Sequence, residues 1–267
     1  MMSSTSLLIN SAAIAVYLAG AIYLVLQTLK QQAGNPRWVI SLVIVALTLH
    51  GFGSYFHLRH PLGLNLGFFK VGALIFWVIN LIVLLSGLKK PLHSLFIFLF
   101  PLSALALAMA TFSGESTMHT TVSGEIVVHI LLSILAYSLL IIATLQAVLL
   151  AYQDYQLRHK HPTGPIRLLP PLQTMEALFF DMLWAGELLL TLSIVTGFLF
   201  LDNMFAQHLA HKTVLSLLAW VIYATLLIGH WRLGWRGYTA IRWALGGFIA
   251  LMLAYFGSKF VLEIILG

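Results

Sequence analysis

The sequence predicts an all-α integral membrane protein, a bundle of about eight transmembrane helices. Apolar residues make up 60% of the 267-residue chain and charged residues only 8%, with a mean hydropathy of +0.97. Soluble globular domains carry about 25% charged residues. Apolar runs recur along the chain, and each is roughly 20 residues long, which is the length of a helix that crosses a bilayer core. A soluble protein is therefore excluded.

Short polar or Gly/Pro-bearing stretches separate the apolar runs. From the N-terminus, the predicted spans are residues 6–28, 38–57, 67–88, 92–112, 125–152, 176–201, 213–231 and 240–265. No large soluble domain fits between them, so we expect one polytopic membrane domain over residues 1–267. The first span lacks a basic n-region and a small-residue cleavage site, which predicts a retained helix and not a signal peptide. A loop at 154–176 holds four of the eight prolines and is expected to connect a first group of five spans to a last group of three.

Lysine and arginine lie mainly on one side of the predicted membrane, and cytoplasmic loops are the ones that hold positive charge. With both termini on the outer side, the cytoplasmic side holds Lys30, Arg37, Lys89, Lys90, Arg158, Lys160, Arg167, Arg232, Arg236 and Arg242. Only Arg59 and Lys212 then fall in outer loops. This topology and anionic lipid explain the net charge of +6, so no nucleic-acid partner is expected.

Several kinds of chemistry are excluded by what the sequence lacks. It contains no cysteine, which rules out disulfides, thiolate catalysis, cysteine-bearing zinc sites and cysteine-attached haem. It also contains no P-loop, no glycine-rich dinucleotide fingerprint and no internal repeat, so a nucleotide-driven pump is not expected.

Histidine is the most informative residue type, with eleven histidines against eight carboxylates. His50 lies in the second span, roughly 18 Å from its inner end at 1.5 Å per residue, near or just beyond the midplane. His129 lies just inside the outer end of the fifth span, and His230 at the inner end of the seventh. His208 and His211, spaced i,i+3 in an outer loop, could clamp a metal, although they lack an evident further ligand. For the others an ordinary interfacial role is favoured: His57, His60, His93, His119, His159 and His161.

An ionisable side chain within the membrane needs a partner, and Glu187 in the sixth span shares the predicted depth of His50. A carboxylate that accepts a proton from one imidazole nitrogen fixes the tautomer and leaves the other nitrogen for a metal. A buried His–Glu pair that only holds two helices together is an equally good interpretation. Lys259 and Glu263, spaced i,i+4 near the end of the last span, are expected to neutralise each other.

Imidazoles at several depths of an apolar bundle are suited to haem. The macrocycle fits an apolar slot between helices, and its iron accepts one or two histidine nitrogens. The 17 Phe, 9 Tyr and 7 Trp residues are explained more simply by packing and interfacial belts. Composition alone therefore leaves haem binding and ion transport open.

Four segments carry a family resemblance: "VVHILLSILAYSLLIIATLQAVLLAYQDYQL", "LLTLSIVTGFLF", "LLAWVIYATLLIGHWRLGWRGYTAIRW" and "LAYFGSKFVLEIILG". In this order they resemble the cytochrome c assembly family of haem-handling membrane proteins (the CcsA/HemX/YpjD type), most closely its YpjD-like inner-membrane branch. The resemblance covers about the last 150 residues well and the first 120 only in topology. It implies a multi-pass protein of the bacterial inner membrane that binds haem b non-covalently, permanently or in transit, with other cytochrome c maturation components as partners.

The resemblance also implies site residues. A histidine heading this kind of span is an outer-side haem ligand in the family's haem exporters, which corresponds to His129. Intramembrane ligands correspond to His50 in "ALTLHGFG" and His230 in "LLIGHWR". Glu187, the predicted partner of His50, is not part of this resemblance and supports the site only through its depth. The exporters' tryptophan-rich outer segment is absent here, because the loop "LDNMFAQHLAHK" has no tryptophan. His208 or His211 is then a candidate replacement for the second ligand.

Three functional hypotheses follow. The first is haem handling in, or alongside, cytochrome c biogenesis, which requires ligation and access but no bond-making chemistry, so we expect no enzyme. The second is an accessory or scaffold subunit without haem, which the missing tryptophan segment favours. The third is an ion- or proton-coupled transporter that uses His50, Glu187 and Lys70, for which broken helices and an inverted repeat would be diagnostic.

Overall fold

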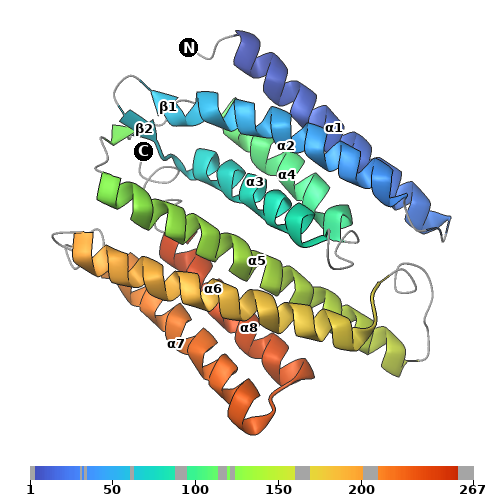
Figure 1. The fold of residues 1–267 in the computed structure, drawn as a ribbon, viewed down its shortest axis with the longest axis vertical. Coiled ribbons are helices and arrows are strands. Elements are labelled where there is room, and N and C mark those ends of the chain that lie inside the picture. Colours follow the sequence, from blue (N-terminus) through green and yellow to red (C-terminus); the bar gives the residue numbers. More distant parts are fainter. Residues whose placement is uncertain are drawn as a thin grey trace. The chain divides into compact units, whose positions relative to one another are not determined.

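The computed structural model describes residues 4–30, 32, 35–60, 63–87, 95–113, 119–120, 124–159, 169–200 and 210–257 (Figure 1). It confirms the all-α membrane architecture. The helices are α1 (Ser4–Leu29), α2 (Pro36–Leu58), α3 (Phe68–Gly87), α4 (Phe96–Phe112), α5 (Gly124–Arg158), α6 (Leu172–Phe200), α7 (Ala210–Leu233) and α8 (Gly237–Met252). Within the described residues, seven helices are long and apolar enough to cross a membrane, and α4, with 17 residues, is a shorter apolar helix.

The helices form two compact units. The first contains Met1–Thr121 and Pro162–Leu169, and the second Val122–His161 and Pro170–Gly267. The division therefore falls after α4, which corrects the expected grouping of five spans and three. The reason is that α5 packs along α6 and α8, so its apolar surface belongs to the second unit. The prediction that the units form one membrane domain over residues 1–267 stays a prediction.

In the first unit, α1 packs against α4 and α2, and α3 packs against α4 and α2. Its interior is aromatic, since the Phe96 and Phe100 rings stack with centroids 5.3 Å apart and Tyr17 lies 5.8 Å from Phe100. Gly20 on α1 permits this packing, because a Cβ at that position would lie 2.5 Å from the Phe100 ring. A glycine in this span therefore brings α1 close to α4.

Three short strands, β1 (Arg59–His60), β2 (Gly63–Asn65) and β3 (His119–Thr120), belong to the same unit. They form an antiparallel sheet in the order β1-β2-β3, with Arg59 opposite Leu64 and Asn65 opposite His119. The sheet links the α2–α3 connection to the segment that precedes α5. The sequence did not predict it, because strands of two or three residues have no measurable apolar periodicity.

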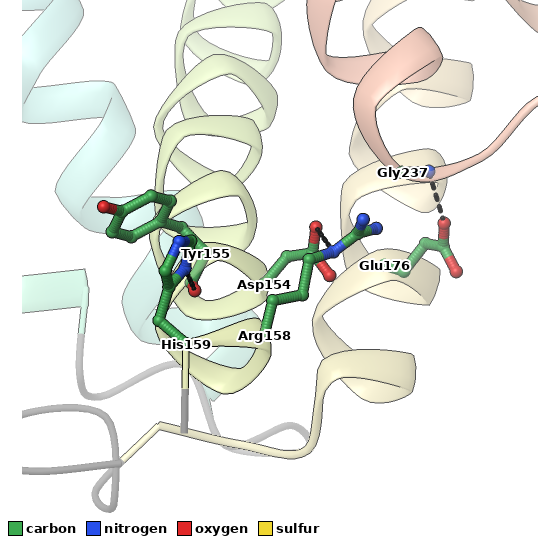
Figure 2. A network of polar contacts seen from close by, with 6 residues as sticks. All are labelled: Asp154, Tyr155, Arg158, His159, Glu176 and Gly237. Carbon is green, nitrogen blue, oxygen red and sulfur yellow. Dashed lines mark hydrogen bonds and ion pairs between the residues drawn. The ribbon is translucent and has the colours of Figure 1, made fainter. Parts of the chain in front are cut away.

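In the second unit, α5 packs along α6, α7 along α8, α8 against α5 and α7 against α6. Helix α5 continues six residues beyond its predicted end at residue 152. An i,i+4 ion pair between Arg158 and Asp154 (3.0 Å) supports its last turn, as does a hydrogen bond from His159 Nδ1 to the Tyr155 carbonyl (2.7 Å; Figure 2). Helix α8 is followed by a π-helical turn at Leu253–Gly257, and the predicted end at 265 lies outside the described residues.

Gly186 offers a test of the contact between α5 and α6. A Cβ at this position would lie 2.8 Å from Leu140 Cγ and 2.8 Å from Leu140 Cδ2. We expect Gly186→Val to lower the free energy of unfolding by about 1–3 kcal/mol, because the added methyl groups overpack the contact. Thermal unfolding in detergent measures the effect.

Gly246→Val in α8 is the matched control, since nothing lies within 4 Å of a Cβ there. Equal melting temperatures for the two variants would contradict the close α5–α6 contact.

Candidate functional site

His129 lies in the second turn of α5 and is half-buried against α6. Its Nδ1 is 2.9 Å from the Ser193 carbonyl oxygen and 3.3 Å from Thr196 Oγ1. Because a carbonyl oxygen only accepts hydrogen bonds, Nδ1 carries the proton, and a neutral ring then has its lone pair on Nε2. No hydrogen bond to Nε2 is found among the described residues.

Hydroxyl groups hold this arrangement in place. Ser133 Oγ donates to the His129 carbonyl (2.8 Å) and lies 2.7 Å from Ser193 Oγ. Thr196 Oγ1 donates to the Ser193 carbonyl at 2.9 Å. Small hydroxyl residues allow two membrane helices to approach and to form hydrogen bonds with each other. The imidazole is therefore fixed to both helices.

His230 occupies the last turn of α7, where its contacts are explained by the helix end. Its Nδ1 donates to the Trp235 carbonyl (2.8 Å), and its ring stacks on Phe180 with centroids 3.5 Å apart. The chain leaves α7 through Gly234, which has a φ of 67°, and the Trp235 amide donates back to the Gly229 carbonyl. This is a glycine-terminated helix end, which the sequence "IGHWRLGW" encodes.

The structure does not bring His129 and His230 together. Their partners on α6, Ser193 and Phe180, are 13 residues apart, which is about 20 Å along a helix. Two nitrogens on one iron must lie within a few ångströms of each other. His129 and His230 therefore cannot ligate the same iron.

His50 belongs to the first unit, where it is fully buried. Its Nδ1 lies 3.1 Å from Tyr17 Oη, and the two rings meet edge to face at 5.7 Å. Sequence reasoning missed Tyr17, although a tyrosine in the middle of the first apolar span was the available signal. Glu187 belongs to the second unit, so the predicted His50–Glu187 pair stays a prediction.

Of the two candidate outer ligands, one falls within α7. His211 is the second residue of α7, with its side chain outside the described part of the structure, and His208 lies wholly outside the described residues. Helices α5 and α7 both run antiparallel to α6. Along α5, His129 contacts Ser193 and Leu140 lies against Gly186. Along α7, Trp220 Nε1 donates to Thr191 Oγ1 and His230 stacks on Phe180. The first turns of α5 and α7 therefore belong to the same end of the second unit (Figure 1).

Of the remaining histidines, His159 is the one whose side chain the structure describes. His159 at the other end of α5 is exposed, and its ring packs 4.1 Å from Tyr155 (Figure 2). The side chains of His57, His60, His93, His119 and His161 lie outside the described part of the structure. Among the described residues, no group of three or more histidine and carboxylate side chains could hold a metal ion.

Comparison with known proteins identifies the family. The profile of the Cytochrome C assembly protein family matches residues 66–266. The chain belongs to this family. Inner membrane protein YpjD of Escherichia coli K12 is 33% identical over 240 residues, which is 89% of this chain and 91% of that protein. An uncharacterized 28.8 kDa protein of Azospirillum brasilense is 32% identical over 193 residues, 70% of this chain and 71% of its own length. No solved structure matches the chain.

As a member of the cytochrome c assembly family, the chain is a multi-pass membrane protein. The expected YpjD-like character is confirmed, and the likeness extends beyond the last 150 residues that the sequence motifs covered. The family match includes His129, His230 and Glu187 but begins after His50. Most of the matched range belongs to the second unit.

The role of His230 at the end of α7 can be tested by stability. We expect His230→Ala to lower the free energy of unfolding by about 1–3 kcal/mol, because the partly buried Trp235 carbonyl loses its donor. Thermal unfolding in detergent provides the measurement.

His159→Ala is the control, since it also loses an Nδ1-to-carbonyl bond, but at an exposed position. If His230→Ala lowers the melting temperature no more than His159→Ala does, the end of α7 does not depend on His230.

Proposed function

We propose that this protein binds haem in the bacterial inner membrane and acts in, or alongside, cytochrome c biogenesis. Membership of the cytochrome c assembly family supports a role in cytochrome c biogenesis. The name of the Escherichia coli relative, inner membrane protein YpjD, supports a location in the inner membrane. The observation that carries the proposal is the hydrogen bond from His129 Nδ1 to the Ser193 carbonyl.

The chemistry of His129 fits an iron ligand. A metal-bound histidine characteristically donates its second ring N–H to a carbonyl or carboxylate, which fixes the tautomer and the ring orientation. His129 has this donor bond, and its other nitrogen retains the lone pair that iron accepts. Haem, when bound, supplies an iron that coordinates the imidazole and a macrocycle suited to an apolar surface. His129 would hold the group, and Ser193, Ser133 and Thr196 would keep the ring in position.

A second ligand from the same end of the unit fits better than one from the opposite end. His211 lies in the first turn of α7, at the end where α5 begins, and His208 precedes it by three residues. His230 is too far along α6 to share the iron of His129. His50 can ligate a metal through Nε2 only in the tautomer whose Nδ1 donates to Tyr17 Oη.

The distribution of lysine and arginine supports an outer-side position for this end of the second unit. Because the segment 201–212 has no tryptophan, we propose that the protein ferries haem, or assists a partner that does, without presenting it to apocytochrome through a tryptophan-rich segment. Ligation and controlled access are sufficient for this role, so no enzymatic step is proposed.

Purified protein tests the proposal directly. We expect protein isolated in mild detergent from haem-replete cells to show a Soret band, and His129→Ala to lose most of it because the ligand nitrogen is removed. Absorbance per mole of protein is the measurement.

His159→Ala, on the same helix with the same kind of carbonyl bond, is the control and should keep the wild-type band. A colourless wild-type preparation that stays colourless after haem addition would overturn the haem proposal.

The second ligand has its own test. We expect His211→Ala to change the haem from six-coordinate to five-coordinate while haem remains bound, because His129 still holds the iron. His230→Ala, at the opposite end of the unit, should leave the coordination unchanged. Resonance Raman or absorption spectra of the reduced protein distinguish the two states. The reverse result, a change in His230→Ala and none in His211→Ala, would reject the assignment.

A further inference from the structure

A carboxyl group is enclosed in the middle of the second unit, where the haem proposal gives it no role. Glu187 lies halfway along α6 with 6% of its surface exposed. Both oxygens, Oε1 and Oε2, are buried and lack a hydrogen-bond partner among the described residues. The Thr191 hydroxyl donates to the backbone carbonyl of Glu187 and not to its side chain. The carboxyl therefore has no donor to stabilise a negative charge.

A tyrosine on the neighbouring helix is enclosed in the same way. Tyr223 on α7 has no exposed surface, and its hydroxyl lacks a hydrogen bond within the described structure. Its ring lies against α8 at Gly247, where an added Cβ would be 2.8 Å from Cε1. The Thr144 side chain of α5 and the Glu187 carboxyl are both near enough to influence the charge of the Tyr223 hydroxyl, although it hydrogen-bonds to neither within the described structure. All four helices of the unit thus contribute to this site.

Thr144 restricts how the tyrosine hydroxyl can be used. Its own hydroxyl donates to the Leu140 carbonyl at 2.8 Å, so towards Tyr223 it can act only as an acceptor. Tyr223 therefore has two acceptors within its surroundings, the Thr144 oxygen and the Glu187 carboxyl. A hydroxyl that can turn from one acceptor to another can follow a change in the charge of the carboxyl.

No cation from the packed helices compensates Glu187. Residues 130–151 of α5, 213–229 of α7 and 243–257 at the end of the described chain contain no Asp, Glu, Lys, Arg or His. The other titratable groups facing this region are Tyr137, which donates to the Leu251 carbonyl at 3.0 Å, and Tyr255, whose ring lies 5.8 Å from it. On α6 itself the nearest is Asp181, about 9 Å along the helix.

We propose that Glu187 is a proton-binding site of the second unit, with Tyr223 as its exchange partner. A carboxylate without donors or cations in a membrane interior is unfavourable, so the packed state holds the neutral acid. When the acid releases its proton to water, the Tyr223 hydroxyl turns from Thr144 and donates to the carboxylate. The site differs from that of His129, which contacts α6 at Ser193, about 9 Å further along the helix. It requires no haem.

Infrared difference spectroscopy on the full chain in detergent at neutral pH tests this proposal. We expect wild type minus Glu187→Gln to show the carbonyl band of a protonated carboxylic acid. That band should shift in D₂O, because the proton exchanges, and should be unaffected by sodium or potassium. Glu176→Gln is the matched control, since this carboxyl on the same helix accepts from the Gly237 amide at the helix end (Figure 2) and should leave the acid band unchanged.

Tyr223→Phe tests the exchange partner, and we expect it to alter the frequency or the deuterium shift of the acid band. Carboxylate bands from Glu187 at neutral pH, or an acid band that sodium or potassium abolishes, would overturn the proposal, the latter in favour of a metal cation. A band that does not shift in D₂O, or that is unchanged in Tyr223→Phe, would overturn the exchange role. If Glu187→Gln does not fold, the acid band of the wild type is compared in H₂O and D₂O and with the band of Tyr223→Phe. A shift in both comparisons supports the proposal, and no shift in either overturns it.

Discussion

The hydrogen bond from His129 Nδ1 to the Ser193 carbonyl is the interaction on which the account of this protein depends. It joins α5 to α6 near the end of the unit where both α5 and α7 begin. It also decides the chemistry of the ring, because the nitrogen that donates to a carbonyl leaves the other as a Lewis base. A histidine that would be costly in an apolar segment is thus held by the backbone of a neighbouring helix and presents one unprotonated nitrogen.

Helix α6 connects the second unit because residues at three positions along its length contact or influence His129, Tyr223 and His230. Ser193 accepts a hydrogen bond from His129, Glu187 lies within electrostatic reach of Tyr223, and Phe180 stacks on His230. Small residues on its buried face, including Gly186, allow α5 to approach closely enough for these contacts. The three positions also differ in role: the proposed ligand His129 is near one end of α6, the buried acid Glu187 is in the middle, and His230, which closes the end of α7, is near the other end.

Much of the fold could be predicted from the sequence, because each apolar run of membrane-spanning length becomes one helix. His129, at the head of its span, also stood out, since an ionisable side chain there needs a partner. The partner itself is a backbone carbonyl on α6. Every residue has such a carbonyl, so the sequence does not indicate which one is used. Tyr17 beside His50 escaped notice for a related reason, because depth along a span does not say which helices are neighbours. The division after α4 depends on which helices pack together. The apolar pattern of a single span carries no information about its neighbours.

The tautomer of His129 tests the central claim most directly. Nitrogen NMR of the haem-free protein, with ¹⁵N-labelled histidine and the His129 signals assigned through His129→Ala, reports which ring nitrogen carries the proton. We predict a proton on Nδ1 and an unprotonated Nε2, and the same tautomer should persist in Thr196→Val because the Ser193 carbonyl is the main acceptor. A neutral ring protonated on Nε2 would contradict the account, since that nitrogen would then have no lone pair for iron.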